Sequence, residues 1–322
     1  MIYYIVTDGY AHTMETFLTH WGTALRDGVS ILRYDDLFSR NELPVGTYIF
    51  ADLERLAPAE LEMAADIWRQ LEESGRGLRL LNHPRHAMRR FELLSTLANH
   101  TQLEGAIVPA MLRGHRVKDM LVIEYCDTAD ENGIFKKYSA FMVGETVIPC
   151  HVDHSCDWVV KDTDLVSLDI VDFERRYLEE NPHEERLREI FKTARIDYGR
   201  IDYSLLDGEI QTWEINTNPV VALSPDEYQP FHLPVKRMFA AQMVPAMVAI
   251  QTDAEPDDVI ALTQSSELLK RMQLDRARAR RTRSRRRFFR QAQRWAVVRF
   301  FRRILKPALG MVSPLIYKAT RH

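Results

Sequence analysis

The chain has 322 residues, of which 46% are hydrophobic and 28% are charged. This composition is typical of a globular protein with a sizeable core, and the length predicts two or three lobes. Three cysteines are too few, and odd in number, for a disulfide framework. The sequence shows neither a signal peptide nor an apolar run of the roughly 18 residues needed to span a membrane. We therefore expect a reducing, cytoplasmic location.

The net charge of −3 conceals an asymmetry along the chain. No acidic residue follows Asp275, whereas 16 lysines and arginines lie in 276–321. The other 27 basic residues face all 46 acidic residues, so residues 1–275 carry a net charge of about −19. An acidic body and a basic tail are expected to have different partners.

The first part of the chain alternates between strand and helix patterns. β-Branched and aromatic residues predict strands at 2–7, 47–51 and 77–81. Apolar residues at helical spacing predict a helix at 58–74, and another begins after Pro84. This order is typical of a small parallel α/β lobe.

Two hairpins are predicted after residue 105. Gly144-Glu145 and Asp207-Gly208 mark their turns, and Asp-Gly is a strong two-residue turn signal. Short apolar runs lie at 106–112 and 120–125. Apolar and turn patterns predict strands at 138–143, 146–149, 158–161, 200–206 and 210–215. They predict helices at 184–198 and 235–250.

The second hairpin carries polar side chains on one face. Because side chains alternate along a strand, Arg200, Asp202 and Ser204 share a face, as do Thr212, Glu214 and Asn216 on the next strand. Magnesium prefers hard oxygen ligands, usually one or two carboxylates with phosphate oxygens and water. From spacing alone, a magnesium site competes with an ordinary solvated hairpin face.

Residues 199–219 resemble the last conserved block of ATP-grasp enzymes. The likeness consists of Arg-x-Asp, a strand, an Asp-Gly turn and then Glu-Ile-Asn-Thr-Asn-Pro. It implies that Arg200 steadies phosphoryl or acyl oxygens, and that Asn218 is a neighbour on the phosphate or substrate side. It also implies a set of ligands for magnesium, or manganese in its place, on the phosphates of ATP: Asp202, Glu214 and Asn216.

Two upstream segments resemble other parts of the same family. Residues 121–127 are similar to the hinge between the nucleotide-binding lobes, where backbone groups meet adenine and an acidic residue meets ribose. The candidates in this segment are Glu124, Tyr125, Cys126 and Asp127. Lys136 and Lys137 precede a hairpin, as does a basic residue that reaches the triphosphate in this family. Lys137 is slightly favoured, and a solvated strand edge is the alternative.

The stretch 99–120 departs from the family. It contains no glycine-rich lid of the kind that closes over the phosphates, although Gly105 and Gly114 are present. Either Arg113 or Arg116 covers phosphate, or the nucleotide lobe is reduced. A reduced nucleotide lobe would affect catalytic turnover more than it would affect the fold.

The segment 150–156 contains two cysteines and two histidines, which are good zinc ligands. A structural zinc site usually has a second pair of ligands, which is missing here. A polar strand end that lines the cleft is the favoured interpretation, with His151 or His154 touching substrate.

The basic tail has an amphipathic pattern. Residues 276–287 hold eight arginines, and apolar residues recur at helical spacing over 297–309 opposite basic ones. An anionic membrane surface is the partner that this pattern favours. Nucleic acid is a weaker alternative, and docking on the acidic body or on a second subunit is another.

Together these features predict an ATP-grasp fold of the α/β class. The predicted regions are a parallel α/β lobe at 1–98, the nucleotide-binding lobes at 99–250, and a linker with a basic amphipathic tail at 251–322. The resemblance implies a magnesium-dependent ligase that joins a small-molecule or peptide carboxylate to an amine or thiol through an acylphosphate. The alternatives are an ATP-dependent phosphotransferase and a membrane-associated nucleotide-binding module without catalysis.

Overall fold

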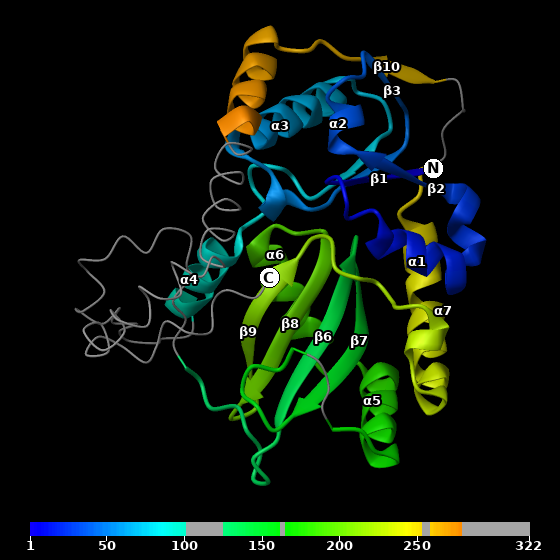
Figure 1. Cartoon of the computed structure of the whole chain (residues 1–322), viewed down its shortest axis with the longest axis vertical. Coiled ribbons are helices and arrows are strands. Elements are labelled where there is room, and N and C mark those ends of the chain that lie inside the picture. Colours follow the sequence, from blue (N-terminus) through cyan, green and yellow to red (C-terminus); the bar gives the residue numbers. More distant parts are fainter. Residues whose placement is uncertain (101–124, 162–164, 253–257, 279–322) are drawn as a thin grey trace, which may run out of the picture. The chain divides into compact units, whose positions relative to one another are not determined.

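A computed structural model describes residues 1–100, 125–161, 165–252 and 258–278 (Figure 1). The chain divides into two compact units, Met1–Ser265 and Ser266–His322. In the second unit, residues 266–278 form a helix, and the rest of the predicted tail lies outside the described residues. No helix in the described ranges is long and apolar enough to cross a membrane.

The first unit begins with a four-stranded parallel sheet in the order β2-β1-β4-β5. The strands are β1 (Ile2–Val6), β2 (Val29–Arg33), β4 (Thr47–Phe50) and β5 (Arg79–Leu81). Three of them confirm the predicted strands, and β2 was not predicted. The predicted α/β class with a parallel first lobe is therefore confirmed.

Helices of this lobe are α1 (His12–His20), the short α2 (Tyr34–Leu37) and α3 (Pro58–Glu73), whereas α4 (Arg90–His100) packs against the second sheet. Pro58 opens α3, where its missing N–H costs nothing, and Glu60 accepts a hydrogen bond from the backbone N–H of Ala57. The structure confirms the predicted helix at 58–74. Two short strands, β3 (Glu42–Pro44) and β10 (Val259–Ala261), pair antiparallel to each other.

A four-stranded antiparallel sheet follows, in the order β7-β6-β8-β9 (Figure 1). Its strands are β6 (Phe135–Val143), β7 (Thr146–Ser155), β8 (Tyr198–Leu206) and β9 (Glu209–Asn216). The accompanying helices are α5 (Leu168–Glu180), α6 (Glu184–Ala194) and α7 (Leu233–Ala249). Both predicted hairpins are present. The predicted strand at 158–161 was wrong, because these residues form bends and irregular backbone.

Helices cover one face of this sheet with aromatic packing. The hydroxyl of Tyr177 on α5 donates to the carbonyl oxygen of Ser139, and its ring packs at 5.3 Å from Tyr138. Tyr203 stacks on Tyr138 with ring centroids 5.4 Å apart. These residues alternate along β6 and β8 with the polar residues of the candidate site, which therefore lie on the other face.

The buried side chain of Asn82 joins the two sheets. It follows β5, has a φ of 64°, and is 0% exposed. Its amide nitrogen donates to the carbonyl oxygens of Phe50 (3.2 Å) and Tyr198 (2.7 Å). Its amide oxygen accepts from the backbone N–H groups of Asp197 and Tyr198, both at 2.9 Å. One side chain thus ties β4 and β5 to the start of β8.

Candidate functional site

The polar face of the β8–β9 hairpin is the candidate site. In the strand register, Asp202 lies opposite Glu214, and Arg200 lies opposite Asn216. The turn that sets this register has positive φ at both Asp207 (51°) and Gly208 (85°), as a two-residue type I′ hairpin requires. Directly opposite residues in an antiparallel pair point to the same face. The four residues singled out from the sequence therefore share one face.

A β-bulge interrupts the hairpin just beyond these residues. Asp202 pairs with Glu214, but the next residue, Tyr203, pairs with Thr212, so Trp213 is the extra residue. The bulge places Thr212 opposite Tyr203, on the face away from Asp202. The expectation that Thr212 shares a face with Glu214 was therefore wrong, because strict alternation does not hold across a bulge.

The polar face continues across β6 and β7. Ser139 pairs with both Asp202 and His151, which makes a row across the sheet that ends at Glu214. Lys137 occupies the same face two residues before Ser139 and lies opposite Asp153. Its Nζ is 3.1 Å from the Asp153 carboxylate and donates to the carbonyl oxygen of Val160 at 2.9 Å.

The two predicted lysines lie on opposite faces of β6. Lys136 pairs with Asp130 at 2.8 Å and lies over the Phe173 ring, whereas Lys137 lies on the face of Asp202. The register therefore gives a physical reason to prefer Lys137 for any contact with a ligand on this face.

Asp202 is buried, with 6% of its surface exposed, and is held by two partners. Arg200 forms a two-pronged ion pair with it, at 2.9 Å from Nε to Oδ1 and 3.3 Å from Nη2 to Oδ2. Ser139 donates to Oδ1 at 2.9 Å. Burial opposes ionisation, but the charges of Arg200 and Lys137 and the hydrogen bond from Ser139 hold the pKa of Asp202 below its usual value. Asp202 is therefore an anion at neutral pH.

Glu214 has an arginine partner that the sequence did not single out. Arg90, at the start of α4, lies 2.9 Å from Glu214 Oε2 and donates from Nε to the carbonyl oxygen of Trp213 at 3.0 Å. Both side chains are partly exposed, at 44% and 36%. No local pattern links residues 90 and 214, so sequence reasoning had no signal for this pair.

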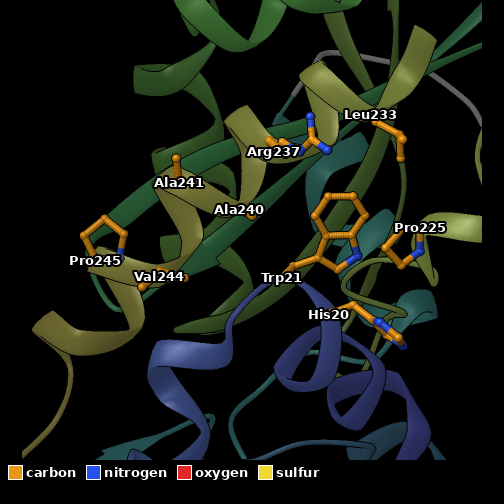
Figure 2. Close-up of a pocket in the computed structure, with 9 residues that line it drawn as sticks. All are labelled: His20, Trp21, Pro225, Leu233, Arg237, Ala240, Ala241, Val244 and Pro245. Atoms are coloured by element: carbon orange, nitrogen blue, oxygen red, sulfur yellow. The ribbon is translucent and has the colours of Figure 1, made fainter. Parts of the chain in front are cut away.

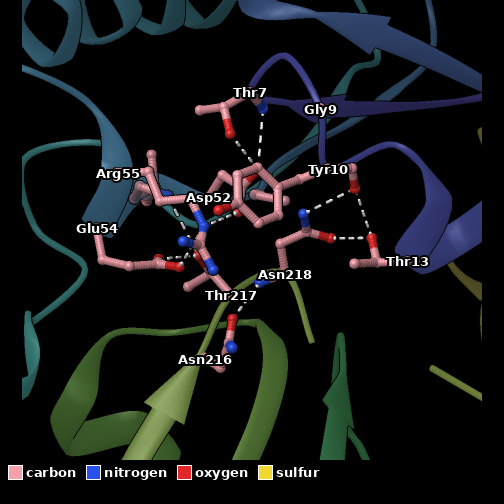
Figure 3. Close-up of polar contacts among 12 residues, drawn as sticks. Thr7, Gly9, Tyr10, Thr13, Asp52, Glu54, Arg55, Asn216, Thr217 and Asn218 are labelled. Carbon is pink, nitrogen blue, oxygen red and sulfur yellow. Dashed lines mark hydrogen bonds and ion pairs between the residues drawn. The ribbon is translucent and has the colours of Figure 1, made fainter. Parts of the chain in front are cut away.

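The end of β9 docks onto the parallel lobe (Figure 3). Asn216 Oδ1 accepts the backbone N–H of Asn218 at 2.8 Å. Thr217 donates from its hydroxyl to Glu54 at 2.9 Å. Asn218 is 2% exposed, and its amide contacts Tyr4, Tyr10 and Thr13 inside the protein.

The described hinge residues lie apart from regular structure. Tyr125 is exposed and packs edge-on against Trp158, with ring centroids 5.5 Å apart. Asp127 accepts the backbone N–H of Ala129. Cys126 is partly buried. Glu124 and Arg113, the other predicted nucleotide contacts, lie outside the described residues.

The cysteine and histidine segment brings no set of three zinc ligands together in the described part of the chain. Among the described residues, no group of three or more His, Cys, Asp or Glu side chains is placed to hold a metal. Cys150 is buried and its Sγ lies 3.2 Å from Nδ1 of His151. Burial, together with the charges of Arg200 and Lys236, lowers the pKa of His151 well below its usual value. His151 is therefore neutral at the edge of the polar row, and His154 is buried near Phe173.

A separate groove of about 500 Å³ lies between the end of α1 and α7 (Figure 2). Its lining includes His20, Trp21, Pro225 and Arg237. The indole N–H of Trp21 donates to the carbonyl oxygen of Leu223 at 2.7 Å. None of the residues predicted to bind nucleotide or metal lines this groove.

The donor set of the hairpin face fits a magnesium ion. Two carboxylates face each other across the strands, and the amide oxygen of Asn216 is one register position away. The backbone N–H of Asn218 fixes that amide atom as the oxygen, and a carbonyl oxygen has a second lone pair to give. These are the hard oxygen donors that magnesium takes alongside phosphate and water.

No protein-family model matches the chain, and no curated protein matches its sequence. Several solved structures are similar to it. The macrocyclase MdnB from Microcystis aeruginosa MRC is 13% identical with a TM-score of 0.36, over 76% of this chain and 98% of that chain. The D-alanine–D-alanine ligase from Bacillus anthracis, complexed with ATP, is 10% identical with a TM-score of 0.38, over 77% and 95%.

A third similar structure is the RiPP-associated ATP-grasp ligase from Chryseobacterium gregarium, in complex with ADP and a leader and core peptide. It is 12% identical with a TM-score of 0.35, over 81% of this chain and 99% of that chain. This third structure is described as an ATP-grasp ligase, which is the class of enzyme that residues 199–219 resemble. Because all three TM-scores lie below 0.5, the function proposed for the chain rests on its own residues and contacts.

Proposed function

We propose that the chain is an ATP-dependent ligase of the ATP-grasp type that joins a carboxylate to an amine or thiol. The observation that carries this proposal is the register of the β8–β9 hairpin. It brings Asp202, Glu214 and Asn216 together on one face, with Arg200 beside them and Lys137 across the sheet. Anionic donors surrounded by fixed cations suit a metal-bound polyphosphate better than an ordinary solvated face.

In this proposal, Asp202, Glu214 and Asn216 hold magnesium on the phosphates of ATP. When bound, the ion would neutralise charge on the phosphate oxygens during transfer. By the resemblance, Lys137 and Arg113 would contribute positive charge toward the phosphates, and the segment from Glu124 to Asp127 would meet adenine and ribose. Manganese is the expected substitute, because it accepts the same oxygen ligands.

The reaction would proceed in two transfers. An oxygen of the substrate carboxylate attacks the γ-phosphorus, the bond to the β-phosphate oxygen breaks, and ADP leaves. The amine nitrogen then attacks the carbonyl carbon of the acylphosphate, the carbon–oxygen bond breaks, and orthophosphate leaves with loss of a proton from nitrogen. Arg200 holds its charge beside Asp202 and would stabilise the oxyanion that develops on the carbonyl.

The proposed carboxylate substrate is a small molecule or a peptide. One of the similar structures contains a leader and a core peptide, and another is a D-alanine–D-alanine ligase. We also propose that the basic tail at 276–309 binds an anionic membrane surface. Flotation of the full chain with anionic vesicles, compared with a chain that ends at 275, tests this, and unchanged flotation would refute it.

The decisive experiment is ATP binding by calorimetry with and without magnesium, for the wild type and for Glu214→Ala. Removing one metal-binding carboxylate is expected to weaken magnesium-dependent binding by roughly 10–100-fold. Glu209→Ala is the matched control, because Glu209 is an exposed carboxylate on the same strand, at the turn end of the hairpin opposite Leu206. Equal affinity in wild type and Glu214→Ala would refute the site.

Turnover is tested separately with hydroxylamine as the trapping nucleophile. A ligase that forms an acylphosphate should convert candidate carboxylates and ATP to hydroxamate, ADP and orthophosphate. ADP release with a hydroxyl acceptor and no hydroxamate would instead favour the phosphotransferase alternative. Magnesium-dependent binding with no ADP release from any acceptor would favour a non-catalytic nucleotide-binding module.

A further inference from the structure

Asn218 joins the end of the candidate hairpin to the parallel lobe through a buried set of hydrogen bonds (Figure 3). Its Oδ1 accepts from the hydroxyl of Thr13 at 2.6 Å and from the hydroxyl of Tyr4 at 2.8 Å. Its Nδ2 donates to the carbonyl oxygen of Tyr10 at 3.3 Å. The three partners lie on β1, on α1 and in the loop between them, more than 200 residues away in the sequence.

The neighbouring positions repeat the same connection. The hydroxyl of Thr217 donates to Glu54 and accepts from the backbone N–H of Leu53 at 3.3 Å. The backbone N–H of Val221 donates to the carbonyl oxygen of Thr13 at 3.3 Å. The chain that leaves β9 is therefore fixed to the parallel lobe at three buried residues, Thr217, Asn218 and Val221.

Buried polar contacts of this kind specify one arrangement. An unpaired buried hydroxyl or amide costs free energy, so the set is favourable only when its members meet their intended partners. Apolar side chains of similar volume would hold the lobes together without fixing an angle. The hydrogen bonds of Asn218 therefore define where the end of β9 lies.

That position is transmitted to Asn216. The backbone N–H of Asn218 donates to Asn216 Oδ1, so the placement of Asn218 sets the direction of the amide oxygen proposed as a metal ligand. Asn216 is also paired with Arg200 across the hairpin. A shift of Asn218 would therefore turn one donor without removing any.

We propose that Asn218 is a positioning residue, with Thr13 as its main partner, and that their contact aims Asn216 at the nucleotide-bound metal. This role replaces the direct phosphate or substrate contact expected from the sequence, because the amide of Asn218 is occupied inside the protein. The proposal rests on the proposed function of the hairpin face.

The test compares Thr13→Val with Thr19→Val, two equal substitutions on α1. Thr13 reaches Asn218, whereas the Thr19 hydroxyl donates to the backbone of its own helix. ATP binding is measured with and without magnesium. Thr13→Val should weaken magnesium-dependent binding by about 10-fold, the scale expected for a residue that orients a metal ligand. Binding without magnesium, and both affinities of Thr19→Val, should stay within about twofold of the wild type.

Two further measurements separate positioning from a loss of folding. Thr13→Ser, which keeps the hydroxyl, should restore the magnesium-dependent affinity. In the metal-free protein, amide hydrogen exchange at Asn218 should be faster in Thr13→Val than in the wild type or Thr19→Val. Equal weakening of ATP binding with and without magnesium, or no rescue by serine, would overturn the positioning role.

The wild type and Glu214→Ala are measured alongside. If magnesium-dependent binding is lost in Glu214→Ala but unchanged in Thr13→Val, the proposed function stands and the positioning role is refuted. If Glu214→Ala binds as the wild type does, the metal site is refuted, and the positioning role with it.

Discussion

Asp202 and Glu214 lie directly opposite each other on β8 and β9, and each carboxylate contacts its own arginine. Arg200 comes from the same strand as Asp202, whereas Arg90 reaches Glu214 from α4. Two carboxylates at this spacing repel each other, and the arginines offset that repulsion. The two ion pairs differ in strength because they differ in exposure. The Arg200–Asp202 pair is stronger, since Asp202 is buried whereas the Arg90–Glu214 pair is open to solvent.

Arg90→Ala is expected to tighten binding of magnesium alone by about 2–5-fold. Arg90 competes with a cation for the Glu214 carboxylate, and an ion pair this exposed contributes roughly 0.2–1 kcal/mol. Calorimetry with magnesium, or manganese as a probe, measures the change. Arg89→Ala removes an exposed neighbouring charge and is the control. Weaker metal binding in Arg90→Ala would show that Arg90 supports the site.

Cys150 is expected to resist alkylation in the native protein. Burial raises the pKa of its thiol to about 12, so at pH 8 only about one thiol in 10,000 is a thiolate. Cys156 is exposed and provides the internal comparison. Mass spectrometry after iodoacetamide treatment should find Cys156 modified long before Cys150, and unfolding in urea should abolish the difference. Equal rates in the native state would contradict the burial of Cys150.

The hairpin could be predicted because its signals are local. Asp207-Gly208 supplies the positive φ values of the turn, and two-residue alternation then places Asp202, Glu214 and Asn216 on one face. The bulge at Trp213 places Thr212 on the other face of the sheet. This could not be predicted, because nothing in the local sequence pattern marks an extra residue.

Contacts between distant segments could not be predicted. Arg90 meets Glu214, and Thr13 meets Asn218, only through the packing of the two sheets. The resemblance implied that Asn218 is a neighbour on the phosphate or substrate side, and its burial among three hydrogen-bond partners is the observation behind the positioning role that we propose instead. The strand predicted at 158–161 was wrong for a related reason, since Trp158 packs on Tyr125 and no strand among the described residues pairs with this segment.

His183 is expected to make the protein less stable as the pH falls below about 6.5. Burial lowers the pKa of His183 from that ordinary value, so the unfolded chain binds its proton at a higher pH than the folded one. At pH values between the lowered pKa and 6.5, unfolding takes up a proton. The free energy of unfolding therefore decreases as the pH decreases through this range. In urea unfolding, the free energy of unfolding of His183→Gln should depend less steeply on pH than that of the wild type. Identical slopes in wild type and His183→Gln would refute this.

Asn82→Ala is expected to lower the free energy of unfolding by about 3–5 kcal/mol. The substitution leaves two buried carbonyls, one buried N–H group and one partly buried N–H group without the partners that Asn82 provides, and each buried loss costs about 1–3 kcal/mol before the protein relaxes. Alanine is also strained at a φ of 64°, so Asn82→Gly should be less destabilising although it loses the same bonds. Urea unfolding measures both, with the exposed Asn41→Ala as a control within about 0.5 kcal/mol of the wild type. A cost below about 1 kcal/mol for Asn82→Ala would mean that this side chain does not hold β4 and β5 to β8.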